Sequence, residues 1–312
     1  MKTTSKKINV LFDIGHPAHF HLFKNFILFL KERGIQFFIV TRNKEITNTL
    51  IKYYGYDYLT LSNPGGNLFT MVFELIKRDL SIFNLQLKHK FTHAFGTSVS
   101  IAHLSAISKV KSYNFNEDDD AVVPLYARLT YPFTTKIINP DCISHDKWKG
   151  KRVFVPSYHE LAYLHPNSFT PDKKILEKYR LHEKKYVIFR LSALKAHHDI
   201  GANGISAELR HKIVNLLADF EIIESKECKT GNKIEPWDMH HILSFAKMII
   251  SDSQTMAAEA MVLGTPSIRI NTFVGKISYL EELENHYQLG YGFLPYDEKE
   301  ILKRVGELTA KN

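Results

Sequence analysis

Short apolar runs alternate with longer amphipathic stretches along most of the chain. The apolar runs are rich in β-branched and aromatic residues, and helical patterns of three- and four-residue spacing separate most of them. Short strands that alternate with helices are typical of a parallel sheet covered on both faces. In the first half, the predicted strands are 8–13, 36–41, 58–62, 92–97, 111–115, 136–140 and 152–157, and the predicted helices include 20–33, 44–54, 67–89 and 98–108.

The alternation stops once and then starts again. The segment 158–185 carries two prolines and many charges, and we interpret it as a linker. A second series follows, with predicted strands 186–192, 220–225, 248–252 and 266–271 and predicted helices 205–218, 237–246 and 255–263. The pattern therefore predicts an α/β protein of two Rossmann-like, doubly wound domains, 1–165 and 166–312, that face a cleft. Whether the last helix packs back on the first domain is left open.

The composition is that of a globular protein. The chain has 312 residues, of which 44% are hydrophobic and 24% charged, enough to bury the cores of two domains. Its two cysteines, Cys142 and Cys228, are far apart and form no CxxC motif, which fits a reducing compartment. The N-terminus lacks the apolar segment of a signal peptide, and no apolar run is long enough to span a membrane. We therefore expect a cytoplasmic protein, either free or at the inner face of the membrane.

The net charge of +8 favours anionic partners, such as nucleotide sugars or lipid headgroups. Nucleic acid is not expected, because the lysines are spread along the chain and no nucleic-acid motif appears. The predicted helix 67–89 mixes apolar residues with Lys77, Arg78 and Lys88. It is predicted either to lie on a membrane surface or to pack into its own domain.

The stretch DIGHPAHFH, residues 13–21, crowds three histidines into the turn after the first predicted strand. Gly15 permits unusual backbone angles, and Pro17 suits a first helical turn. His16 and His19 are three residues apart, so they share one face of the helix. An imidazole with a pKa of about 6.5 is suited to general base catalysis near neutral pH. We expect His19 to be the base and His16 to shape the loop or contact an acceptor.

Other roles for these side chains stay open. A buried, hydrogen-bonded position against the sheet or core is favoured for His21. Asp13 is the next candidate for a catalytic base. A zinc site would need a further ligand such as His197 or His198, and we expect no metal cofactor.

The second motif is IISDSQTMAAEAMVLGTPSIRIN, residues 249–271, in which a buried strand leads through a polar turn into a small-residue helix. Hydroxyl and free N–H groups at a helix start form an anion site that suits a diphosphate. Glu259 lies one turn into the helix, where a carboxylate can accept hydrogen bonds from both hydroxyls of a ribose. The alternative is a capped core helix with a solvated Glu259. The polar residues of the turn are Asp252, Ser253, Gln254 and Thr255.

The third motif is FRLSALKAHHDIGANGIS, residues 189–206, which follows the first strand of the second domain. A loop with cations and glycines beside a strand end suits contact with a diphosphate. We assign Arg190, Lys195 and His198 to the binding of such a diphosphate ligand, together with Gly15 of the first loop and the polar residues of the second motif. The alternative is an irregular surface loop.

These three motifs together resemble the domain-of-unknown-function 354 family. That family is similar to the GT-B superfamily of glycosyltransferases and to the non-hydrolysing UDP-GlcNAc 2-epimerases, which share its fold. The resemblance covers nearly the whole chain and implies a GT-B fold with the acceptor on the first domain and the nucleotide sugar on the second.

The epimerases carry Ser-Asp-Ser-Gly-Gly-x-x-x-Glu in the segment that corresponds to the second motif. By this resemblance, Ser253 falls on the phosphate-binding serine and Glu259 on the ribose-binding glutamate. Gln254 and Thr255 replace the two glycines, which keeps the N–H donors and adds side chains.

The transferase that makes lipid II has a Gly-rich first loop that ends in a histidine, and His19 matches that histidine. The transferase histidine is proposed to help activate the acceptor hydroxyl. The epimerases carry Arg-Pro-Glu in this loop, which this chain lacks. The resemblance thus implies a metal-independent glycosyltransferase that uses a nucleotide sugar, with UDP as the expected nucleotide, and a saccharide or lipid-linked acceptor in surface polysaccharide or glycoconjugate synthesis. A UDP-GlcNAc 2-epimerase-like enzyme and a non-catalytic sugar-nucleotide-binding protein are the alternatives.

Overall fold

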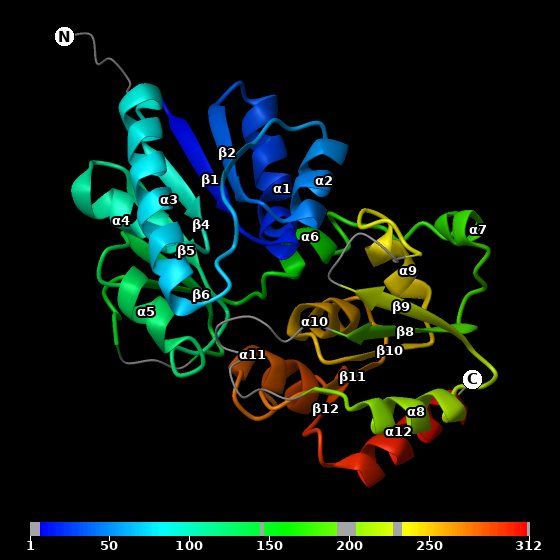
Figure 1. Ribbon diagram of the computed structural model, residues 1–312. Helices are drawn as coiled ribbons and strands as arrows, with labels where there is room; N and C mark the ends of the chain where they lie inside the picture. The colour runs from blue at the N-terminus through cyan, green and yellow to red at the C-terminus, as the bar shows by residue number, and fades with distance from the viewer. Residues whose placement is uncertain (1–6, 144–146, 192–203, 227–232, 311–312) are drawn as a thin grey trace. The chain divides into compact units, whose positions relative to one another are not determined.

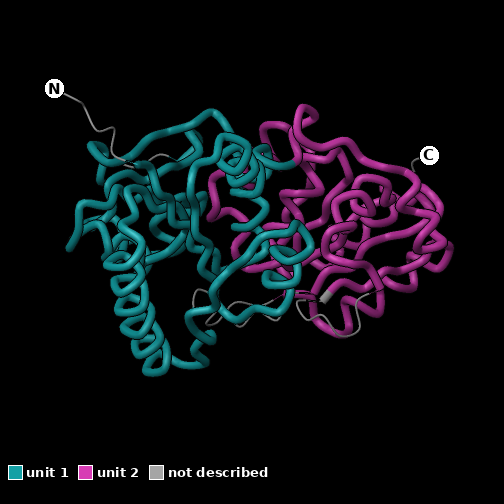
Figure 2. Tube along the Cα trace, turned by 90° about the horizontal axis from the view of Figure 1, so that it is seen from above, with its two compact units in different colours: residues 1–163 teal, residues 164–312 magenta. Residues whose placement is uncertain are grey.

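The computed structural model describes residues 7–143, 147–191, 204–226 and 233–310. The chain divides into two compact units, unit 1 over residues 1–163 and unit 2 over residues 164–312 (Figure 2). The sequence-based division was placed at 165/166. Each unit is built around its own parallel sheet.

Within the described residues, unit 1 holds a seven-stranded parallel sheet in the order β3-β2-β1-β4-β5-β6-β7 (Figure 1). Its strands are β1 (Asn9–Ile14), β2 (Gln36–Arg42), β3 (Leu59–Ser62), β4 (His93–Gly96), β5 (Lys111–Phe115), β6 (Lys136–Pro140) and β7 (Arg152–Val155). Its helices are α1 (Pro17–Glu32), α2 (Glu45–Tyr53), α3 (Leu68–His89), α4 (Val99–Ile107), α5 (Pro124–Thr130) and α6 (Leu161–Leu164), which ends at the boundary.

The sheet of unit 1 carries buried apolar side chains on both faces. On one face of β1, Leu11 joins Ile82 of α3 and Leu104 of α4 in a buried cluster. On the other face, the Phe12 ring packs at 5.6 Å from the ring of Phe23 in α1. Helices α3, α4 and α5 thus cover one face, and α1 and α2 cover the other (Figure 1).

Unit 2 holds a five-stranded parallel sheet within its described residues, in the order β12-β11-β10-β8-β9. Its strands are β8 (Tyr186–Leu191), β9 (Glu221–Lys226), β10 (Met248–Ser251), β11 (Ser267–Ile270) and β12 (Gly290–Phe293). Its helices are α7 (Ile175–Tyr179), α8 (Ala207–Leu216), α9 (Met239–Phe245), α10 (Gln254–Val262), α11 (Ser278–Glu281), the π-helix η2 (Glu282–His286) and α12 (Glu298–Ala310).

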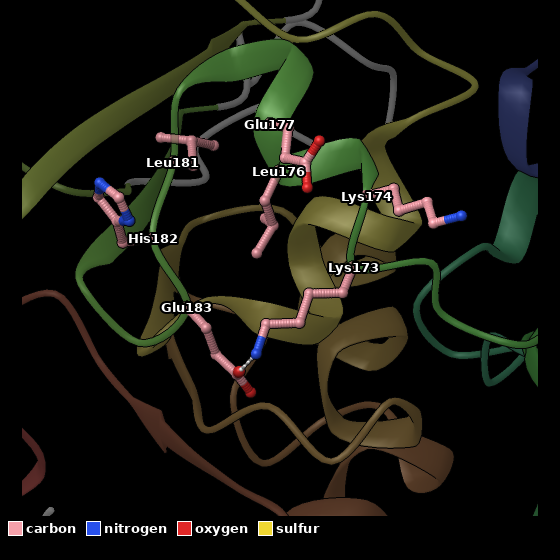
Figure 3. A pocket seen from close by; sticks show the side chains of 7 residues that line it. All are labelled: Lys173, Lys174, Leu176, Glu177, Leu181, His182 and Glu183. Carbon is pink, nitrogen blue, oxygen red and sulfur yellow. Dashed lines mark ion pairs between the residues drawn. The ribbon is translucent and has the colours of Figure 1, made fainter.

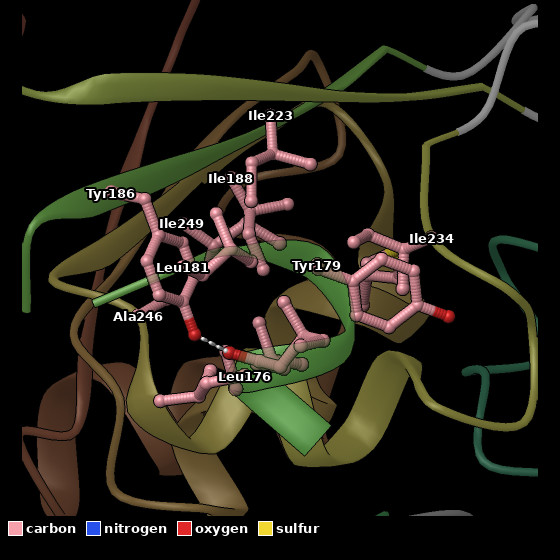
Figure 4. Close-up of a cluster of buried hydrophobic side chains, with 13 residues drawn as sticks. Leu176, Tyr179, Leu181, Tyr186, Ile188, Ile223, Ile234, Ala246 and Ile249 are labelled. Atoms are coloured by element: carbon pink, nitrogen blue, oxygen red, sulfur yellow. Dashed lines mark hydrogen bonds between the residues drawn. The ribbon is translucent and has the colours of Figure 1, made fainter. Parts of the chain in front are cut away.

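The segment predicted as a linker is part of the core of unit 2. Leu176, Tyr179 and Leu181 are buried against Ile223 and Ile249 of the sheet (Figure 4). The interpretation of 158–185 as a linker is therefore wrong for its second half. Charged residues are more numerous than apolar ones there, but the apolar residues still pack into the core. The last helix, α12, also belongs to unit 2, where its buried side chains join the cluster on the opposite face of the sheet.

In each sheet, successive strands are first added on one side and then, from one point on, on the other side. This point is the topological switch point. Unit 1 has the order 3-2-1-4-5-6 of a Rossmann sheet, extended by one strand, with its switch point between β1 and β4. Unit 2, numbered from its first strand, has the flavodoxin-like order 2-1-3-4-5, with its switch point between β8 and β10. Loops at the carboxyl ends of strands beside a switch point are where such sheets bind ligands.

Candidate functional site

The first-loop histidines lie where β1 ends and α1 begins, at the switch point of unit 1. His16 is the N-cap of α1, and its Nδ1 accepts a hydrogen bond from the Ala18 N–H at 3.3 Å. Pro17 occupies the first helical position, where its missing N–H costs nothing. The ring centroids of His16 and His19 are 5.8 Å apart. The loop therefore presents two imidazoles together at the carboxyl edge of the sheet.

Two expectations for this loop have different outcomes. Gly15 does not have a positive φ, and a Cβ there would make ordinary contacts with Arg42 at 3.8 Å and His19 at 3.9 Å. The turn therefore does not use the backbone freedom that Gly15 permits. His21 is buried, and its ring stacks on Tyr163 at 5.3 Å, so it faces the core of unit 1 as predicted.

The imidazole of His19 is half-buried and faces Thr97, which follows β4 across the switch point. Thr97 Oγ1 lies 2.8 Å from Nδ1 and 2.8 Å from Nε2 of His19, so it can bond one ring nitrogen at a time. Burial, followed by the nearby His159, lowers the pKa of His19 to about 3, although Asp13 acts in the opposite direction. His19 is therefore neutral at neutral pH, and its basicity is far weaker than the ordinary value of 6.5 that the sequence argument used.

Asp13, at the end of β1, is buried and fully surrounded by unit 1. Its carboxylate forms an ion pair with Arg78 of α3 and accepts a hydrogen bond from the Ser98 hydroxyl, the N-cap of α4. Gly96 lies opposite Asp13 in the sheet, and a Cβ there would come within 2.7 Å of the Asp13 carbonyl oxygen. Asp13 therefore joins β1 to α3 and α4 directly beneath the histidine loop.

The ion pair of Asp13 belongs to a larger polar network that the sequence analysis missed. Arg78 also donates to the Thr41 carbonyl at 3.2 Å and to the Ser62 hydroxyl at 3.1 Å. Glu74 accepts from Ser62 at 2.8 Å and pairs with Arg42 at 2.9 Å. The network links the carboxyl ends of β1, β2 and β3 to α3. Glu74 and Arg78, which are four residues apart and so share one face of the helix, were the available signal.

A second pair that the sequence analysis missed is Glu117 with His159. Glu117 follows β5 and His159 follows β7, so both lie on the carboxyl side of the sheet. The Glu117 carboxylate is 3.3 Å from Nδ1 of His159 and accepts its backbone N–H at 3.2 Å. Nε2 of His159 is buried and has no hydrogen-bond partner among the described residues. A carboxylate that orients one ring nitrogen and leaves the other available is the usual arrangement of a histidine base.

Metal binding finds no support in the described part of the chain. No group of three or more histidine, cysteine, aspartate or glutamate side chains there is arranged to hold a metal ion. His197 and His198, the further ligands of the alternative zinc site, lie outside the described residues, as does Lys195 of the donor-binding prediction.

In unit 2, the predicted anion site lies at the switch point, where β10 ends and α10 begins. Ser253 is the N-cap of α10, and its N–H donates to the Ser251 hydroxyl at 2.8 Å while its own side chain makes no capping bond. Ser253, Gln254 and Thr255 are partly exposed. The first N–H groups of a helix have no partner inside the helix and carry its positive dipole end. Asp252 is buried, and its carbonyl accepts from Asn271 at 2.9 Å.

Arg190 stands on the other side of the same switch point, near the end of β8. Its guanidinium donates to the Ser225 hydroxyl at 3.1 Å, and its carbonyl accepts the Asp252 N–H at 3.2 Å. Arg190 is therefore held beside the strand that leads to α10. The loop that contains His198 follows β8 and lies outside the described residues.

Glu259, predicted to bind a ribose or to be solvated, is instead 4% exposed. Its Oε1 lies 3.0 Å from Nε2 of His240 in α9, whose ring stands edge-on to Phe169 at 6.1 Å. The solvated alternative is wrong, because the apolar helix around Glu259 packs inward. The carboxylate joins α10 to α9 below the helix start.

Arg269 is a further residue that the sequence analysis did not single out. It is fully buried near the end of β11 and pairs with Glu284 of η2 through Nε at 2.7 Å and Nη2 at 2.8 Å. It also donates to the Asn271 carboxamide oxygen at 3.3 Å. A Cβ on Gly292 would collide with the Glu284 carboxylate. The pair fixes the loops on the carboxyl side of β10 and β11.

A pocket of about 340 Å³ lies elsewhere in unit 2, around α7 (Figure 3). Its rim carries Lys173 and Glu183, which form an ion pair at 2.6 Å. None of the predicted site residues lines it, and we assign it no role. Its lining residues are Lys173, Lys174, Leu176, Glu177, Leu181, His182 and Glu183.

Solved structures show which class of fold these two units form. UDP-GlcNAc 2-epimerase of Methanocaldococcus jannaschii, in complex with UDP-GlcNAc and UDP, matches with a TM-score of 0.69 at 15% identity, over 98% of this chain and 94% of that one. The epimerase of Rickettsia bellii matches with a TM-score of 0.68 at 15% identity, over 98% and 89%. Spinosyn forosaminyltransferase SpnP matches with a TM-score of 0.62 at 11% identity, over 98% and 91%. The chain therefore has a GT-B-like fold of two Rossmann-like domains, as predicted.

A family model also matches most of the chain. The model of the family described as "Protein of unknown function (DUF354)" matches residues 8–277, and the chain belongs to this family, which confirms the resemblance read from its motifs. No curated protein matches the sequence significantly.

Proposed function

We propose that this protein is a GT-B-type glycosyltransferase that transfers a sugar from a nucleotide sugar to a hydroxyl group of a saccharide or lipid-linked acceptor. The observation that carries the proposal is positional. The histidine loop and the polar turn, found independently in the sequence, each lie at the carboxyl-end switch point of a doubly wound sheet.

Unit 2 would bind the donor. The start of α10 offers backbone N–H groups, the positive end of the helix dipole and the hydroxyls of Ser253 and Thr255 to a diphosphate. Arg190 is a nearby cation. Uridine is our choice of base because structures that share this fold were solved with UDP, including those of the M. jannaschii epimerase and S. aureus MnaA.

Unit 1 would bind the acceptor, with His19 as the general base. The acceptor oxygen attacks the anomeric carbon, the bond from that carbon to the diphosphate breaks, and the diphosphate leaves with the electron pair. The hydroxyl proton moves to the ring nitrogen of His19 that Thr97 does not bond. The start of α10 stabilises the negative charge that develops on the leaving group, so no metal is required for that task.

The low pKa of His19 favours transfer over epimerisation. A hydroxyl becomes strongly acidic as its oxygen bonds to the anomeric carbon, so a weak base can accept its proton late in the reaction. Epimerisation at C2 requires removal of a carbon-bound proton, for which a base with a pKa of about 3 is poorly matched. As the family resemblance implies, we place the reaction in cytoplasmic steps of surface polysaccharide or glycoconjugate synthesis.

The second candidate is a UDP-GlcNAc 2-epimerase, because epimerases with the same fold match 98% of the chain. Proton NMR of a panel of UDP-sugars, with and without an acceptor mixture, separates the two. Transfer predicts UDP release that depends on the acceptor. Formation of a C2 epimer without any acceptor would establish the epimerase instead, and binding of UDP without either reaction would leave a non-catalytic binding protein.

A further inference from the structure

Helix α3 exposes many apolar side chains and buries two charged ones, unlike an ordinary surface helix. A helix that covers a sheet normally buries its apolar residues and exposes its charges. In α3, the buried residues are Glu74, Arg78 and Ile82, so two of its charges point inward. Ile82, Phe83 and Leu85 pack against the core of unit 1, but seven other large apolar side chains of α3 point to solvent. The exposed ones are Leu68, Phe69, Val72, Phe73, Ile76, Leu80 and Leu87.

The outward apolar residues form one continuous stripe. Phe69, Phe73, Ile76, Leu80 and Leu87 follow each other at intervals of three, four or seven residues, which brings them to one side of an α-helix. Phe69 is 72% exposed and Leu80 is 60% exposed. The centroids of the Phe69 and Phe73 rings are 4.8 Å apart. From Phe69 to Leu87 the stripe runs for roughly 27 Å, far beyond the scattered apolar residues of a normal surface.

The charges on the outer side of α3 are positive. Lys77 and Lys88 are exposed, and so is Lys90 at its C-cap. The two acidic residues of the helix are both paired on its other sides, Glu74 with Arg42 at 2.9 Å and Asp79 with His103 at 2.7 Å. No carboxylate of α3 is therefore left to neutralise the exposed lysines.

We propose that α3 docks unit 1 on an anionic lipid surface, with the apolar stripe in the headgroup region and the lysines against lipid phosphates. A phenylalanine-rich stripe beside lysines is the pattern of a helix that lies in the plane of a membrane interface. No described helix is long and apolar enough to cross a bilayer, so α3 would lie on the surface.

A second copy of the chain is the other occupant to consider, and charge argues against it. When two helices pack antiparallel across a two-fold axis near their midpoints, equivalent flanks of the two helices meet. Lys77 lies at the middle of α3, so this contact would bring the two Lys77 side chains together without an unpaired acid of α3 between them. An anionic surface complements the same lysines.

The test is co-sedimentation of the full chain with vesicles made of equal parts phosphatidylglycerol and phosphatidylcholine, compared with pure phosphatidylcholine. The wild type should bind the anionic vesicles and be released by salt. Lys77→Glu with Lys88→Glu should weaken binding by at least about fivefold for each lysine. The matched control is Lys299→Glu with Lys303→Glu on α12, which removes two exposed lysines elsewhere and should change little.

A second pair of variants tests the apolar stripe. Phe69→Ser with Phe73→Ser should reduce vesicle binding by more than about tenfold, whereas Tyr296→Ser, at a side chain that is 77% exposed in unit 2, should not. Circular dichroism melts check that every variant folds. The proposal is overturned if the wild type ignores anionic vesicles, if the control variants lose as much binding as the α3 variants, or if light scattering shows a dimer that Phe69→Ser with Phe73→Ser converts to a monomer without any vesicle binding.

Discussion

His19 should make unit 1 less stable in mild acid, and the size of the effect follows from its environment. In the folded chain its pKa is lowered to about 3, chiefly by burial, whereas an unfolded chain has the ordinary value of 6.5. As the pH falls below 6.5, the unfolded state gains a proton that the folded state does not bind. The free energy of unfolding must therefore decrease between pH 6.5 and pH 3, and it is unaffected by this group above pH 6.5.

At about pH 5, which is roughly 1.5 units below the ordinary pKa, the free energy of unfolding is lowered by at most about 2 kcal/mol, at about 1.36 kcal/mol per unit. Solvent at the exposed part of the ring reduces this loss. The assay is urea unfolding, followed by circular dichroism, at about pH 8 and about pH 5 for the wild type and for His19→Gln, whose side chain does not titrate. All other groups are common to both proteins, so the difference between the two pH-dependent losses isolates His19. If the wild type and His19→Gln lose the same free energy of unfolding between the two pH values, this imidazole is not buried in its neutral form.

Four further outcomes follow from the same structure. Gly96→Ala should destabilise unit 1 by about 1–3 kcal/mol, because its Cβ would collide with the Asp13 carbonyl, and urea unfolding measures this. Glu259→Ala should cost about 1–3 kcal/mol, because it removes the buried carboxylate that contacts His240, so a melting temperature equal to that of the wild type would contradict the pairing. His19→Ala should lower turnover by about 10²–10⁴-fold with little change in UDP affinity, as steady-state kinetics and calorimetry would show. Transfer requires the unit 1 base to reach a donor on unit 2, so saturating UDP should reduce the radius of gyration in small-angle scattering, and an unchanged profile would argue against closure.

Local pattern was enough to predict most strands of both sheets. Strands such as Asn9–Ile14 and Tyr186–Leu191 are continuous apolar runs flanked by helical periodicity, so their type is visible from the residues alone. The strand Gly290–Phe293 was missed because Gly-Tyr-Gly-Phe has little intrinsic strand preference. Its pairing with β11 at the edge of the sheet makes it a strand.

The candidate site could be predicted only where its residues share one loop. His16 and His19 are close in the chain, and so are Ser253 and Thr255. Glu117 and His159 are brought together by the strand order, which cannot be predicted from any local sequence pattern. Burial could not be predicted either, and it decides the chemistry. The same burial that lowers the pKa of His19 also turns Glu259 into a structural partner of His240.

The central claim is that the start of α10 binds the diphosphate of a nucleotide sugar, and calorimetry with UDP tests it most directly. Thr255→Glu places a negative charge in the first turn of α10, where the helix dipole favours it but a diphosphate is repelled. Thr255→Gln is the neutral control of nearly equal size. Thr255→Gln removes the hydroxyl that we assign to the diphosphate, so we expect it to weaken UDP binding by a few-fold, whereas Thr255→Glu should bind UDP at least about tenfold more weakly than Thr255→Gln and stay folded. Failure of the wild type to bind any nucleoside diphosphate, or equal UDP affinity in Thr255→Glu, would contradict it.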